Sequence, residues 1–188
     1  MIINLTPLST AFSIILCLSP TIKIVSDTYF ENILPSKAQE VKVYLTNEDT
    51  GDIVWCGFLT PKIYDMDYVN CNEIIELEAA DCISVLQYID YEPFKDMGII
   101  NMKNIIDRLC TSTQLLEGYY IPLTKKMEDG TWLKFSNLQI SETNFFSSDM
   151  EEAWTYQEVL DEICKYLGLT AIQIGTKLHF VDFTAYNK

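Results

Sequence analysis

The feature that most constrains this chain is a helix-then-hairpin pattern over Thr155–Phe183. Apolar residues recur there at helical spacing and form one stripe, while polar and acidic residues take the opposite face. The stripe consists of Tyr156, Val159, Leu160, Ile163, Cys164 and Leu167. Thr155 and Glu158 have capping-box spacing, and Gly168 stands where a helix end favours a left-handed residue. The pattern therefore predicts a helix with two defined ends.

Two extended runs follow this helix, Thr170–Ile174 and Lys177–Phe183. Gly175-Thr176 between them is typical of a tight hairpin turn. An isolated hairpin is only marginally stable in water. We therefore expect this one to pack on the helix stripe or to join strands from earlier in the chain.

The first part of the chain favours strands. Thr21–Val25 is a β-branched run, and Glu40–Leu45 alternates apolar and polar residues before the turn cluster Asn47–Gly51. Asp52–Leu59 is the return strand of an antiparallel hairpin, and Glu73–Ala79 alternates as a third strand.

After Ala79, the apolar residues recur at helical spacing instead of alternating. Asp81 and Asn101 each stand at an N-cap position before an apolar stripe. The two stripes are Cys82, Val85, Leu86 and Ile89, then Met102, Ile105, Ile106, Leu109 and Cys110. From Thr111 to Asp149 the pattern is ambiguous, with short strands at Tyr119–Leu123 and Trp132–Phe135.

This order predicts an α+β fold: an antiparallel sheet or small β-barrel-like core with about three helices, closing with a helix and a β-hairpin. The length of 188 residues suits a single domain, residues 1–188. Within it, residues 1–20 are an atypical N-terminal segment, 21–79 the strands, 80–154 a helical and mixed insertion, and 155–183 the helix plus hairpin.

The charge balance limits the partners. Thirteen basic and twenty-seven acidic residues give a net charge of −14, which repels nucleic acid and anionic membranes. We expect no tight nucleic-acid binding and no membrane association. The acidity either keeps the surface soluble or forms a surface that DNA passes without sticking.

The six cysteines do not form a CxxC pair, so metal-site spacing is absent. Cys82, Cys110 and Cys164 fall on predicted helix stripes, where a free thiol behaves as a small core hydrophobe. Disulfides are the alternative, and the spacing does not favour them.

The apolar stretch Ala11–Leu18 has two interpretations. It could be the core of a signal peptide, but it lacks a basic segment before it and a small-x-small cleavage site. It is also too short to span a bilayer, which takes about 20 residues. A buried first strand is the favoured interpretation.

No residue pattern predicts a catalytic, cofactor-binding or metal-ligating site, so we expect no cofactor and no enzymatic activity. His179 is the lone histidine and is expected to be a structural strand residue. Glu76 and Glu78 share a strand face as the paired carboxylates of a hydrolase would, but a solvated face explains them better. Asp65 and Asp67 lack EF-hand spacing. Phosphate-loop, dinucleotide-binding and GxSxG motifs are absent.

Three stretches taken together carry a family resemblance. The first runs from Tyr29 to Leu45; the second joins Trp55–Pro61 and Tyr64 to Ile75–Tyr88; the third joins Tyr156–Leu169 to Phe180–Phe183. In this order they resemble tail and baseplate-hub proteins of phages and prophages of gut (Bacteroides-type) bacteria. The resemblance covers most of the chain, from about Ser26 to Phe183.

The resemblance implies a non-enzymatic virion structural protein, made in the bacterial cytoplasm, that self-assembles in a ring around the tail axis. The implied partners of the protein are copies of itself and other tail or baseplate proteins. The resemblance does not assign a catalytic role to any residue. The alternative is a secreted or periplasmic binding module of a gut bacterium, if Ala11–Leu18 is a signal.

Overall fold

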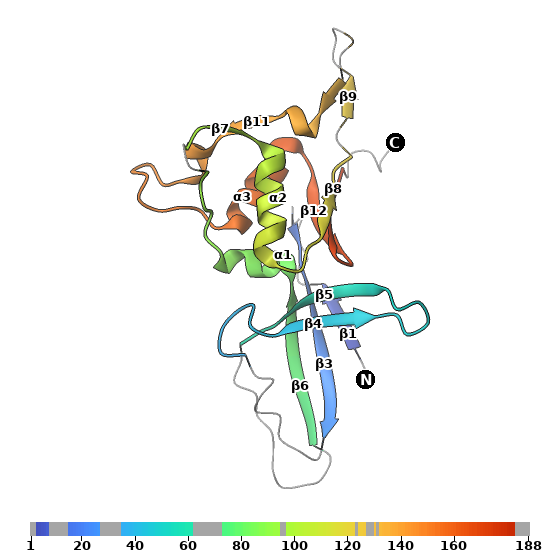
Figure 1. Cartoon of the computed structure of the whole chain (residues 1–188). Helices are drawn as coiled ribbons and strands as arrows, with labels where there is room; N and C mark the ends of the chain where they lie inside the picture. The colour runs from blue at the N-terminus through green and yellow to red at the C-terminus, as the bar shows by residue number, and fades with distance from the viewer. Residues whose placement is uncertain are drawn as a thin grey trace.

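The computed structural model describes residues 3–7, 15–26, 35–61, 73–94, 97–122, 124–126, 130 and 132–182. These residues form an α+β fold, as predicted, with three α-helices beside one end of a long antiparallel sheet (Figure 1). Among them neither of the two larger sheets closes into a barrel, so the antiparallel-sheet alternative is the correct one.

The larger sheet has five antiparallel strands in the order β1-β3-β6-β5-β4. Their bounds are Ile3–Pro7 (β1), Leu18–Ser26 (β3), Glu73–Asp81 (β6), Ile53–Leu59 (β5) and Lys42–Thr46 (β4). The predicted hairpin and the third strand are thus confirmed. Strand alternation places Ile75, Leu77 and Ala79 of β6 in a core.

The second sheet has four strands in the order β2-β12-β13-β8. Their bounds are Ile15–Leu16 (β2), Thr170–Ile174 (β12), Lys177–Val181 (β13) and Gly118–Tyr120 (β8). β12 and β13 form the predicted hairpin, β2 joins β12 in parallel and β8 joins β13 in parallel. The closing hairpin therefore does both things expected of it: it recruits earlier strands and packs on helices.

Two small two-stranded sheets complete the described strands. β7 (Ile99–Asn101) pairs with β11 (Gln139–Ser141), and β9 (Thr124–Lys126) pairs with β10 (Trp132–Lys134).

The helices are α1 (Cys82–Val85), α2 (Met102–Thr113) and α3 (Tyr156–Leu167). α3 has the predicted capping box between Thr155 and Glu158, and Gly168 ends it in the left-handed region at φ 66°. α1 is shorter than its stripe suggested, because the chain tightens into a 3₁₀ turn at Leu86–Tyr88. Among the described residues, no helix has both the length and the apolar character needed to cross a bilayer.

Two hydrophobic cores result. The larger one packs the helices on one face of the four-stranded sheet and includes Leu160, Ile163, Leu178 and Phe180. The smaller one lies on the five-stranded sheet and includes Ile22, Trp55, Leu59, Ile75, Leu77 and Ala79. β5 contributes to both, with Cys56 and Phe58 in the first and Trp55 and Leu59 in the second.

Gly57 is the point of closest approach inside β5. A Cβ atom built there would lie 2.2 Å from the Ala80 carbonyl oxygen and 2.5 Å from the Trp55 indole. The Trp55 ring therefore covers the space that any side chain at position 57 would need.

We predict that Gly57→Ala destabilises the fold by about 3 kcal/mol or more, because backbone and indole cannot both yield to the new methyl group. Gly118→Ala is the matched control, since a Cβ at Gly118 meets nothing within 4 Å. Urea melts followed by circular dichroism compare the two, and equal losses would contradict the close approach.

A second prediction concerns the orientation of α3. Leu160 is fully buried whereas Glu162 is exposed on the opposite face. Leu160→Ala should cost roughly 2–5 kcal/mol through the cavity it leaves, and Glu162→Ala about 0.5 kcal/mol or less. Similar losses for both in urea melts would show that the helix packs on a different face.

Candidate functional site

The candidate residues that the structure describes do not come together. His179 lies in the middle of β13, half-buried, with its ring 6.0 Å from that of Tyr120 on β8. Glu76 and Glu78 lie on the exposed face of β6, where Glu76 pairs with Lys23 of β3. Asp65 and Asp67 lie outside the described residues. Within the described part of the chain, no group of three or more metal-ligating side chains occurs.

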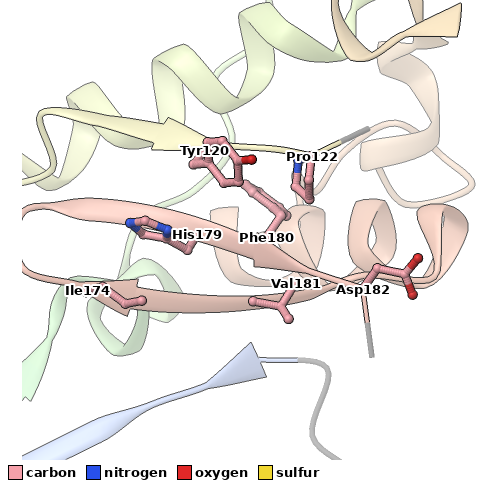
Figure 2. A pocket seen from close by; sticks show the side chains of 7 residues that line it. All are labelled: Tyr120, Pro122, Ile174, His179, Phe180, Val181 and Asp182. Atoms are coloured by element: carbon pink, nitrogen blue, oxygen red, sulfur yellow. The ribbon is translucent and has the colours of Figure 1, made fainter. Parts of the chain in front are cut away.

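The outer face of the four-stranded sheet carries a hollow beside His179 (Figure 2). It has a volume of about 560 Å³ and is open to solvent. Its lining is Tyr120, Pro122, Ile174, His179, Phe180, Val181 and Asp182. Tyr120 is 60% exposed and Ile174 is 55% exposed, so both offer apolar surface to a partner.

Strand alternation explains how this face arises. Leu178 and Phe180 of β13 point into the core, so Lys177, His179 and Val181 point outward. The register pairs His179 with Ile172 of β12 and with Tyr120 of β8. An aliphatic, an imidazole and a phenol side chain therefore lie in one row across three strands. Such a row suits contact with an apolar or aromatic surface better than acid–base chemistry.

A buried polar junction lies behind this face and joins the two sheets. The Gln173 side-chain amide reaches between β5 and the start of α1: Nε2 donates to the Cys56 carbonyl (2.7 Å), and the Cys82 N–H donates to Oε1 (2.8 Å). Nε2 also donates to the Gly175 carbonyl (3.0 Å). Gln173 is 5% exposed, so these bonds form away from water.

Asp81 is the other buried polar group at the junction, fully enclosed at the end of β6. Its carboxylate accepts from the Leu18 N–H at 2.6 Å and from the Ser84 N–H at 2.7 Å, and the Ser84 hydroxyl also donates to it. Burial raises the pKa of Asp81, and these hydrogen bonds offset only part of that rise. Asp81 thus caps α1 and anchors β3.

A third buried polar contact holds the loop before β7. The Glu142 carboxylate is fully buried and accepts from the Tyr91 hydroxyl (2.6 Å) and the Phe94 N–H (2.8 Å). Burial and this carboxylate raise the pKa of Tyr91. Arg108 covers the Phe94 ring at 3.5 Å and donates to the Glu92 carbonyl. These contacts fix a loop and do not present a reactive group.

Asp81 is predicted from the sequence as a helix cap, whereas the buried role of Gln173 was missed. A signal for it existed, because strand alternation puts Gln173 on the same face as the buried Ala171. A polar residue at a core-facing strand position needs a hydrogen-bonding partner. What the sequence could not supply was the partner, since Cys56 lies 117 positions away.

We predict that Gln173→Met destabilises the protein by roughly 2–4 kcal/mol, because the Cys56 carbonyl and the Cys82 N–H lose their partners while the volume is kept. Gln139→Met, at an exposed position of β11, is the matched control and should cost less than about 0.5 kcal/mol. A loss at Gln173 no larger than at Gln139, in the same melts, would contradict the junction.

Comparison with known proteins gave similarity in structure alone. No protein-family model matches the sequence, and no curated protein matches it. One similar solved structure is the 43 kDa tail protein of prophage MuSo2 from Shewanella oneidensis, with a TM-score of 0.48 and 13% identity over 88% of this chain and 44% of that chain. Another is the prophage tail protein gp18 from Listeria monocytogenes EGD-e, with a TM-score of 0.45 and 12% identity over 88% of this chain and 40% of that chain. The chain spans less than half the length of either protein.

Proposed function

We propose that this chain is a non-enzymatic structural domain of a phage or prophage tail, of the tail or baseplate-hub kind. In this role it associates with copies of itself around the tail axis and with neighbouring tail proteins in the virion. The sequence resemblance given above suggests this role and a gut-bacterial host, and one surface supports it: the outer face of the four-stranded sheet.

The hollow on that face has the composition of an interface centre. Interface centres are poor in charged residues and rich in aromatic ones. The hollow on this face is lined by seven residues, of which Asp182 is the only carboxylate. On a chain with a net charge of −14, a face of this kind is where two acidic copies can approach.

Sheet edges offer a second means of association. β4 ends the five-stranded sheet, and within the described residues no further strand pairs with its outer side. An unpaired edge can accept a strand from a neighbouring subunit. Repeated contacts of this kind, together with the apolar face, would build a closed ring if the rotation between copies closes.

The alternative of a secreted binding module depends on removal of Ala11–Leu18. Ile15–Leu16 form β2, which pairs in parallel with Ala171–Ile172 of β12. Cleavage after this segment would expose the edge of β12 to solvent, so the pairing favours its retention in the folded protein.

We predict that association is weak at low salt and stronger at moderate salt. Repulsion between chains of charge −14 opposes contact, and salt near physiological strength screens it beyond about 8–10 Å. Sedimentation velocity over a salt series measures this. Binding to duplex DNA, followed by fluorescence anisotropy in the same buffers, should be negligible throughout. Tight DNA binding or turnover of a glycan or peptide would overturn the structural role.

Ile174→Lys tests the face itself, because it puts a charge on an exposed apolar residue that lines the hollow and should abolish association at moderate salt. Tyr166→Lys is the matched control: Tyr166 is 72% exposed on α3, away from the hollow, and its replacement should leave association unchanged. Equal effects of the two variants would place the contact elsewhere.

A further inference from the structure

We propose that Cys56 and Cys82 form a dithiol site that closes to an internal disulfide within the folded protein and covalently joins β5 to the start of α1. Their sulfur atoms lie 3.9 Å apart, and both residues are fully buried. This inference rests on the junction and not on the proposed role in a tail.

The strand register places the two thiols opposite each other. Gly57 pairs with Asp81 as the last partners of the β5–β6 ladder, so Cys56 and Cys82 occupy the next facing positions. Facing positions of neighbouring antiparallel strands bring their side chains close. A disulfide needs a sulfur–sulfur distance of 2.03–2.05 Å, so the sulfurs must approach by about 2 Å, a shift that side-chain rotation can supply.

The backbone around the pair is held by Gln173. Its amide occupies the place of the next ladder hydrogen bond, accepting from the Cys82 N–H and donating to the Cys56 carbonyl. Nε2 also lies 3.4 Å from the Cys56 sulfur. The two side chains are therefore kept facing each other by an element outside both strands.

The surroundings of the two thiols shift their pKa values in opposite directions. The contact between the two sulfur atoms, in which either thiol can be the donor, lowers the pKa of Cys56, and the same contact together with burial raises the pKa of Cys82. We therefore assign Cys56 as the sulfur that reacts first. Burial raises the pKa of Cys110 and of Cys164 to about 12, which makes these thiols poor competitors.

The oxidant for this step is an azodicarboxamide such as diamide. The Cys56 thiolate adds to one nitrogen of the N=N bond and forms an S–N bond. The Cys82 sulfur then attacks the Cys56 sulfur, which forms the S–S bond and breaks the S–N bond. The azo group leaves as the hydrazine, having taken two electrons and two protons from the two thiols.

The folded full chain is treated with diamide, the diamide is removed, and the remaining thiols are blocked with N-ethylmaleimide in urea, which exposes the buried cysteines. The peptides are then mapped without reduction. Lys62 separates Cys56 from Cys71, and Glu73, Glu76 and Glu78 separate Cys71 from Cys82, so trypsin with a glutamate-specific protease distinguishes all three. We expect one crosslinked pair containing Cys56 and Cys82, two hydrogen atoms lighter than the separate peptides.

Oxidation should also raise the thermal midpoint by roughly 6–15 °C, because the crosslink restricts the unfolded chain, and dithiothreitol should reverse the rise. The Cys82→Ala variant should not show this rise in the thermal midpoint, whereas Cys164→Ala, at another fully buried cysteine, should still show it.

The proposal is overturned if both cysteines are recovered blocked by the maleimide, if the crosslink forms only in urea-unfolded protein, or if Cys82→Ala keeps the rise. Should Cys82→Ala not fold, the peptide map of the unaltered chain decides alone.

Discussion

One buried side chain, Gln173, hydrogen-bonds the hairpin of the four-stranded sheet to β5 of the five-stranded sheet. Its amide pairs with the buried Cys56 carbonyl of β5, whose other contact is a weak one from the Cys82 thiol at 3.9 Å, and with the buried Cys82 N–H of α1. A buried polar group left unpaired costs about 1–3 kcal/mol, whereas a paired one contributes a smaller net gain. The amide therefore acts chiefly as a constraint: other dispositions of the hairpin would leave these groups unsatisfied. It fixes β12 against β5 in one position.

Local sequence patterns predicted the helices and strands well, but they did not predict which distant strands pair. The helix at Tyr156–Leu167 and the hairpin after it were confirmed because capping, periodicity and turn chemistry all act within a few residues. The α+β class followed from their order. The parallel pairing of β2 with β12 and of β8 with β13 was not predicted, since it joins segments more than fifty positions apart.

The same division applies to the candidate site. Strand alternation could predict which side chains of β13 face outward, but not that Tyr120 would lie beside His179, because that neighbour depends on the pairing with β8. The prediction that no residue is catalytic or metal-ligating stays a prediction. In the described part of the chain, the buried polar groups Gln173, Asp81 and Glu142 serve mainly to hold backbone segments.

The junction and the outer face are parts of one hairpin, and this links the fold to the proposed association. The carbonyl of Gly175, at the turn of that hairpin, accepts from Gln173, and Gly175 forms an isolated bridge with Trp55 of β5. A Cβ at Gly175 would lie 3.1 Å from the Ile53 carbonyl, and φ at Gly175 is 58°. The turn is therefore close to β5 and suited to glycine.

Glu117 accepts a hydrogen bond from the Thr176 hydroxyl at the same turn and holds β8 beside β13. The positions of Tyr120 and Ile174 are thus set by the junction. A partner that binds the outer face contacts a surface whose shape is fixed before the partner arrives, which lowers the entropy cost of association.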